Sequence, residues 1–222
     1  MTTNFLSLAA SIGKRIKSKE PRAALSIRGV PVVLRQYFTI RNNFIKDEDF
    51  TFTVIAGYKP GKIKRVIKGY EGIKILINEN HASTNQAESI RIYLKDNKVD
   101  NLIIFHGDLL FIDAPMPKEE STCFYDGSYD FRQDEVGVNI QDGYVNNLSY
   151  GLETKWSQML YLTGKELDLL YSICEAPNFK SYFMTFELIN QIIALGGKFK
   201  AVPHIGTINE IDSLEDINNL EG

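Results

Sequence analysis

Residues 8–22 read LAASIGKRIKSKEPR, a short apolar run that breaks into a loop of small and basic residues. Residues 4–10 (NFLSLAA) predict a buried first strand, and the loop that leaves it contains Ala10, Ser11 and Gly13. Small residues at a strand end let backbone N–H groups approach a ligand closely. The stretch sets five cations against the single acid Glu20: Lys14, Arg15, Lys17, Lys19 and Arg22. It predicts a phosphate-holding loop, with a solvated basic turn as the alternative.

The composition is that of one globular domain, residues 1–222. Of its 222 residues, 44% are hydrophobic and 24% are charged, as in a folded domain with a sizeable core. No apolar run approaches the ~20 residues of a membrane span, and no signal-peptide pattern is present. We therefore expect a cytoplasmic protein without membrane contact. The net charge of -3 argues against a nucleic-acid partner. Cys123 and Cys174 lack paired spacing and predict buried thiols.

In the first half of the chain, strand patterns alternate with helix patterns. The expected order is strand 4–10, a helix starting at Pro31, strand 51–56, a helix from Pro60 to about Ile67, strand 73–78, helix 84–95 and strand 101–105. The last of these, NLIIF, is a nearly continuous apolar run, as in the central strands of parallel sheets. The alternation predicts a parallel sheet covered by helices.

The second half has a different pattern, typical of antiparallel hairpins. Three short β-like pieces, STCFYDG, EVGVNIQDG and YVNNL, are separated by Asp-Gly turns. Thr163 and Glu166 predict a capping box at the start of a helix. A further helix is expected from about Thr185 to the Gly196-Gly197 pair, which should end it. The strand KFKAV then leads to EID and a short C-terminal helix, in which Asp216 is expected to cap with Ser213.

The opening segment resembles the signature of the nucleotidyltransferases that make sugar nucleotides and CDP-choline. In that family LAAGxGxR is followed by PKxL and a G-x-P turn, and here LAASIGKR, EPRAAL and RGVPVVLRQ stand in the same order within residues 8–36. The GK[ST] end of a Walker A loop is absent. Four later segments are similar to further motifs of the family: VIAGY (54–58), INENHASTNQAESI (77–90), FHGDLLF (105–111) and NEIDSLEDI (209–217).

The resemblance implies an α/β fold, a three-layer α/β/α sandwich whose central sheet is mixed but mainly parallel. Such a fold is Rossmann-like and glycosyltransferase-A-like, with a small antiparallel hairpin region on the acceptor side. Residues 1–113 would form the nucleotide-binding half and residues 114–222 the acceptor-binding half. The implied reaction is Mg²⁺-dependent transfer of a nucleoside monophosphate from a nucleoside triphosphate, with CTP favoured, to a phosphorylated sugar or phosphocholine-like acceptor. Pyrophosphate is released.

The resemblance also implies roles for individual residues. Nucleotide binding falls on Leu8, Ala9, Ala10, Ser11, Gly13, Lys14, Arg15, Arg22, Asn85 and Ser89. Arg15, Arg22 and Asp108 would be catalytic, and Asp108 and Asp212 would hold Mg²⁺, a hard ion that favours carboxylate oxygens. Lys155 could reach the acceptor phosphate, although an exposed lysine is equally expected. Without the resemblance, Asp108 would be interpreted as an ordinary turn residue.

Three positions depart from the family pattern. Ser11 stands where glycine is usual, Arg22 where lysine is usual, and Gln158 where many relatives have an acid. Two alternatives therefore stay open: a catalytically degenerate nucleotide-binding protein of the same fold, and a glycosyltransferase that uses a sugar nucleotide. The sequence does not decide between monomer and homodimer.

Overall fold

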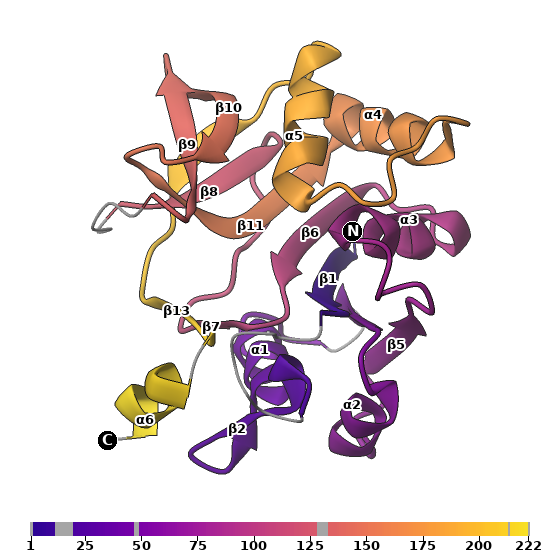
Figure 1. The fold of residues 1–222 in the computed structure, drawn as a ribbon, viewed down its shortest axis with the longest axis vertical. Coiled ribbons are helices and arrows are strands. Elements are labelled where there is room, and N and C mark those ends of the chain that lie inside the picture. Colours follow the sequence, from indigo (N-terminus) through magenta and orange to yellow (C-terminus); the bar gives the residue numbers. More distant parts are fainter. Residues whose placement is uncertain (1, 12–19, 47–48, 128–132, 213, 222) are drawn as a thin grey trace.

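A nine-stranded mixed sheet forms the centre of the protein (Figure 1). The structure is a computed structural model that describes residues 2–11, 20–46, 49–127, 133–212 and 214–221. The strand order is β5-β4-β1-β6-β11-β8-β12-β10-β9, and the first four strands in this order are parallel. The strands are β1 (Thr3–Ala9), β4 (Phe50–Ala56), β5 (Ile73–Ile77), β6 (Asn101–His106), β8 (Thr122–Asp126), β9 (Val136–Gln141), β10 (Tyr144–Tyr150), β11 (Lys155–Thr163) and β12 (Lys200–Pro203).

Helices cover both faces of the sheet and make three layers. All seven residues of β1 are buried, and successive side chains point to opposite faces. Phe5 packs in a core with α1 (Val32–Arg41) and α2 (Pro60–Val66), whereas Leu6 packs in a second core with α3 (Gln86–Asp96), α4 (Gly164–Glu175) and α5 (Thr185–Ala194). The predicted α/β/α sandwich with a mixed sheet is therefore confirmed. The sheet is not mainly parallel, however, because four of its strand pairings are parallel and five are antiparallel.

Two short ribbons lie outside the main sheet. β2 (Ser26–Ile27) pairs with β3 (Val30–Pro31), and β7 (Leu109–Phe111) pairs with β13 (Ile208–Glu210). A single 3-10 turn, η1 (Arg22–Ala24), precedes β2. The C-terminal helix α6 (Leu214–Glu221) lies beside the first ribbon, and Ile211 anchors it in a small buried cluster. This arrangement fixes the chain just before α6.

Most predicted elements are present, and two expectations need correction. Pro31 is the N-cap of α1 and Pro60 begins α2, as predicted. The Thr163–Glu166 capping box is wrong: the Thr163 hydroxyl donates to the Asp100 carbonyl, and the Glu166 carboxylate accepts from the Lys198 N–H. Strand β11 was not predicted, although it lies at the centre of the sheet. Both cysteines are buried free thiols, as expected.

None of the helices in the described part of the chain is both long and apolar enough to cross a membrane.

Candidate active site

The site begins where β1 and β6 end side by side. Gly107 follows β6, and its N–H donates to the Leu8 carbonyl at 3.0 Å. A Cβ at position 107 would lie 2.6 Å from the Ala9 Cβ, so only glycine allows this approach. Gly57, after β4, is equally constrained, because a Cβ there would lie 2.7 Å from the Ala10 carbonyl oxygen. These two glycines bring three strand ends together at one edge of the sheet.

The β7–β13 ribbon brings acidic residues from distant parts of the chain to this edge. Glu210 of β13 pairs with Leu109 of β7, and the Ile211 N–H donates to the Asp108 carbonyl at 3.0 Å. Asp212 follows, and its N–H donates to Asp216 Oδ2 at 2.9 Å. Asp216 therefore acts as a local hydrogen-bond acceptor; Ser213, its expected capping partner, lies outside the described residues.

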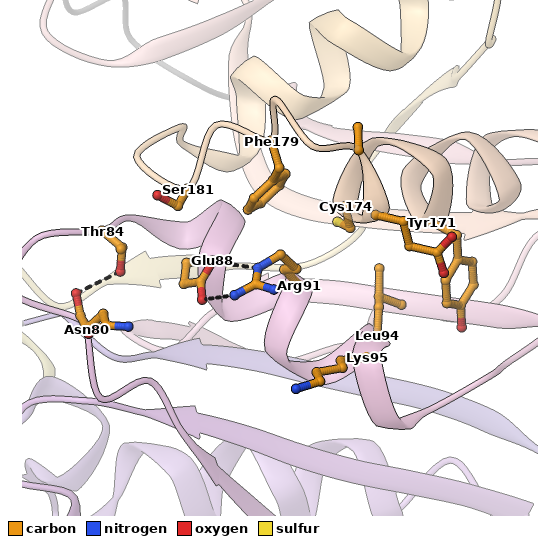
Figure 2. A pocket seen from close by; sticks show the side chains of 12 residues that line it. Asn80, Thr84, Glu88, Arg91, Leu94, Lys95, Tyr171, Cys174, Phe179 and Ser181 are labelled. Atoms are coloured by element: carbon orange, nitrogen blue, oxygen red, sulfur yellow. Dashed lines mark hydrogen bonds and ion pairs between the residues drawn. The ribbon is translucent and has the colours of Figure 1, made fainter.

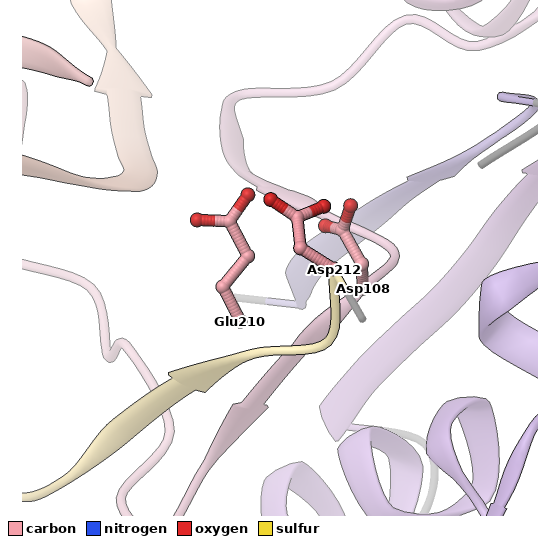
Figure 3. A group of neighbouring side chains, drawn as sticks. All are labelled: Asp108, Glu210 and Asp212. Atoms are coloured by element: carbon pink, nitrogen blue, oxygen red, sulfur yellow. The ribbon is translucent and has the colours of Figure 1, made fainter. Parts of the chain in front are cut away.

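Three carboxylates converge at this point (Figure 3). One oxygen from each of Asp108, Glu210 and Asp212 lies within 4.8 Å of the other two. Arg22 bridges two of them, because its Nη1 contacts both Asp108 Oδ2 and Asp212 Oδ1. The four side chains are largely buried. Burial, together with the charges of Asp108 and Asp212, raises the pKa of Glu210 to about 8.

The carboxylates line a cavity of about 470 Å³. Of the residues predicted for the site, those on its wall are Leu8, Ala10, Ser11, Arg22, Asn85, Ser89, Asp108, Lys155 and Asp212. Ala9 is not on the wall, because β1 alternates and points its side chain into the core under α1. Gly13, Lys14 and Arg15 lie outside the described residues.

Another wall of the cavity is the start of α3. Asn85 is the N-cap of this helix, and its Oδ1 accepts the Gln86 N–H at 3.0 Å. Ser89 is buried, and its hydroxyl oxygen accepts from Asn78 Nδ2 at 3.2 Å. Both side chains are thus already held by protein partners, which fixes the shape of this wall.

The wall formed by β11 carries Lys155, Trp156 and Gln158. Lys155 Nζ lies 2.8 Å from Glu135 Oε2 and 3.9 Å from Glu210 Oε2. Gln158 Nε2 donates to Glu210 Oε2 at 2.7 Å. The Trp156 ring packs edge-to-face on His106, with 5.5 Å between ring centroids. Burial lowers the pKa of His106, so a neutral ring stands beside the carboxylates.

Neither Glu210 nor the contacts of Gln158 could be recognised from the motifs in the sequence. The signal for Glu210 is its position two residues before Asp212, because residues i and i+2 of an extended segment face the same side. Gln158 was identified only as a departure from the family pattern. No short-range pattern indicates its contact with Glu210, since Gln158 lies in β11 of the main sheet and Glu210 in the separate β7–β13 ribbon, 52 residues later.

A second cavity, about 590 Å³ in volume, lies between α3 and α4 (Figure 2). Arg91 crosses it and donates to both carboxylate oxygens of Glu88, at 2.8 and 2.5 Å. The guanidinium also lies over the Phe179 ring, 5.7 Å from its centroid. The central cation of this cavity is therefore matched by a carboxylate and an aromatic face of the protein itself.

Comparison with solved structures identifies the fold. CTP:phosphocholine cytidylyltransferase from Streptococcus pneumoniae superposes with a TM-score of 0.81 at 17% identity, covering 100% of this chain and 98% of that one. The inositol-1-phosphate CTP transferase from T. maritima gives a TM-score of 0.75 at 15% identity, covering 100% and 95%. The chain therefore has the nucleotidyltransferase fold that its motifs resemble. No protein-family model matches the chain.

Sequence comparison finds curated relatives over part of the chain. The bifunctional protein GlmU of Caldicellulosiruptor saccharolyticus is 29% identical over 119 residues, which is 54% of this chain and 25% of that protein. GlmU of Thermosipho africanus is 31% identical over 110 residues, 48% of this chain and 22% of that protein. The matched part is about a quarter of the length of either relative.

Proposed function

We propose that the protein is a nucleotidyltransferase that joins a nucleoside monophosphate from a nucleoside triphosphate to a small phosphorylated acceptor. The observation that carries this proposal is the convergence of Asp108, Asp212 and Arg22 on one cavity. The strand end at Ala10 and Ser11 lies on the same cavity wall. Nucleotidyl transfer brings several anions together. It therefore requires cationic groups and cation-binding groups beside a loop that can approach phosphate.

The acidic cluster fits a hard divalent cation. Asp108, Glu210 and Asp212 offer only oxygen ligands, and Asp108 Oδ1 is buried without a hydrogen-bond partner in the described part of the chain. Such a donor set suits Mg²⁺, which takes one or two carboxylates together with substrate phosphates and water. When bound, Mg²⁺ would neutralise charge on the phosphates and on the leaving pyrophosphate.

Two arginine side chains would bind the phosphates of the substrates. Arg22 holds two carboxylates, and in the complex its guanidinium would turn to the α-phosphate and the incoming phosphate, as an arginine fork can bind both. Arg15 would bind the β and γ phosphates. An oxygen of the acceptor phosphate attacks the α-phosphorus, the bond to the β-phosphate breaks, and pyrophosphate leaves. No general base is needed, because the second pKa of a phosphate monoester is about 6.

Residues 1–113 would bind the nucleotide, for which CTP is the favoured candidate, and residues 114–222 would bind the acceptor. On the acceptor side, Lys155 is paired with Glu135, and the cavity wall includes Tyr150, Trp156 and Phe186. An aromatic wall suits a sugar face or an ammonium group. The two acceptor classes to compare are therefore sugar phosphates and amino-alcohol phosphates. The cytoplasm, where nucleoside triphosphates are made, is the proposed compartment.

The test is a pyrophosphate-release screen. Four nucleoside triphosphates are paired with sugar 1-phosphates, polyol phosphates, phosphocholine and phosphoethanolamine, each with and without Mg²⁺. We expect at least one pair to turn over, with Mg²⁺ required and Asp108→Ala lowering the rate by about 10³-fold. Nucleotide binding without turnover of any pair would favour the degenerate nucleotide-binding protein. Turnover of an intact sugar nucleotide would favour the glycosyltransferase.

A further inference from the structure

A β-bulge interrupts β11 at the edge of the candidate active site. The register between β11 and β8 shifts between Trp156 and Leu160. Trp156 Nε1 donates to the Met159 carbonyl at 3.2 Å, and the Ser157 hydroxyl donates to the Phe124 carbonyl at 2.7 Å. Side chains of the bulge thus satisfy carbonyls within it and on the neighbouring strand. Bulges next to active sites re-aim side chains.

Gln158 forms the apex of the bulge in an uncommon conformation. Its φ is +59°, in the left-handed region that non-glycine residues rarely occupy. Such a conformation costs on the order of 1 kcal/mol and persists where the surrounding structure fixes it. This conformation directs the Gln158 side chain toward the carboxylates. Asparagine or glycine would adopt this backbone conformation more readily.

The amide nitrogen of Gln158 is the group that contacts the acidic cluster. Its Nε2 donates to Glu210 Oε2 at 2.7 Å. An amide carries two N–H donors on this nitrogen, so it can hold a carboxylate oxygen without adding a charge.

Gln158 and Lys155 approach the same oxygen of Glu210. Lys155 Nζ lies 3.9 Å from Glu210 Oε2, the atom to which Gln158 donates. The Glu210 carboxylate lies beside Asp108 and Asp212 (Figure 3). An acid at position 158 would remove the donor and add a fourth carboxylate, so an amide is the group that suits this place.

We propose that Gln158 is a positioning residue whose amide holds Glu210 as the third carboxylate of a divalent-cation site with Asp108 and Asp212. The inference rests on the proposed function, because it assumes that this cluster binds a cation. Groups that orient cation ligands from outside typically change affinity by 10–100-fold when removed. The strained backbone at position 158 is maintained because it aims this amide.

The test measures Mn²⁺ binding by electron paramagnetic resonance without nucleotide or acceptor. Gln158→Asn and Gln158→Gly both suit a left-handed backbone, but asparagine is one methylene too short and glycine has no amide. We expect the Kd for Mn²⁺ to rise about tenfold in both variants, with thermal midpoints equal to or above that of the parent. Glu210→Gln should weaken binding at least as much, and adding Gln158→Asn to it should have no further effect.

The proposal is overturned if both Gln158 variants bind Mn²⁺ within twofold of the parent. It is also overturned if the effects of Gln158→Asn and Glu210→Gln add fully, or if the parent does not bind Mn²⁺. A failure of the proposed function is distinguishable, because it would appear as absent pyrophosphate release while the Mn²⁺ results stay as expected.

Discussion

The two cavities described above differ in how their charges are matched. The larger, about 590 Å³, lies between α3 and α4, and its Arg91 is bound by both oxygens of Glu88. The smaller, about 470 Å³, collects three carboxylates around Arg22, and the pKa of Glu210 is raised to about 8. Strongly shifted pKa values gather at functional sites. The three crowded carboxylates and the raised pKa of Glu210, rather than the cavity volume, therefore mark the candidate site.

The largest expected effect is a difference in activity between a variant of the smaller cavity and a variant of the larger one. Asp212→Asn removes a carboxylate from the smaller cavity while keeping its size, and should lower pyrophosphate release by about 10³-fold with little change in the folded state. Arg91→Leu leaves the buried Glu88 carboxylate without its guanidinium, and should cost about 1–2 kcal/mol of stability. Urea unfolding and turnover per folded molecule measure both variants.

Activity within twofold of the parent is expected for Arg91→Leu. The opposite outcome, an inactive Arg91→Leu with an active Asp212→Asn, would place the chemistry in the larger cavity.

A second prediction concerns the competition between Arg22 and a cation for the same carboxylates. Because the guanidinium contacts both Asp108 and Asp212, Arg22→Ala should tighten Mn²⁺ binding several-fold while lowering turnover by about 10²-fold. Mn²⁺ titration and steady-state kinetics measure the two effects, with Arg91→Ala as the matched arginine control. Weaker Mn²⁺ binding in Arg22→Ala would show that the guanidinium supports the cluster instead of competing with a cation.

A third prediction follows from the raised pKa of Glu210. Its pKa rises from 4.5 to about 8, so between these values the folded protein keeps a proton that the unfolded chain releases, and stability falls as the pH rises. In the presence of a chelator, Glu210→Gln should therefore be more stable than the parent at pH 8.5, by a few degrees in midpoint temperature, and nearly equal to it at pH 4.5. An equal gain in midpoint temperature at both pH values would contradict the raised pKa of Glu210.

The smallest effect concerns the thiol in the larger cavity. Burial raises the pKa of Cys174 to about 12, so its thiolate is scarce at pH 8. We expect Ellman's reagent to react with the native protein far more slowly than with the urea-unfolded chain. Rapid labelling of Cys174 that also stops turnover would mean that the two cavities are coupled.

The sequence predicts the first half of the fold well, because its signals are local. Buried β1 and β6 appear as apolar runs, and Pro31 and Pro60 mark helix starts. Asp108 and Asp212 could be identified because each lies in a segment that resembles a family motif. The structure brings these two residues together, while their proposed roles still await the experiments above.

Features that depend on long-range pairing could not be predicted. β11 mixes polar and apolar residues around a bulge, so no clean alternation indicates a strand. Glu210 reaches Asp108 only through the β7–β13 ribbon. The Thr163–Glu166 capping box failed because partners distant in sequence, Asp100 and Lys198, take both side chains.

The most direct measurement is an anomalous difference map from a crystal grown with Mn²⁺ and the nucleoside triphosphate that the screen selects. The account predicts the strongest manganese peak among Asp108, Glu210 and Asp212, with triphosphate density between this peak and Ser11. Nucleotide density in the cavity beside Arg91, or a manganese peak away from all three carboxylates, would contradict it.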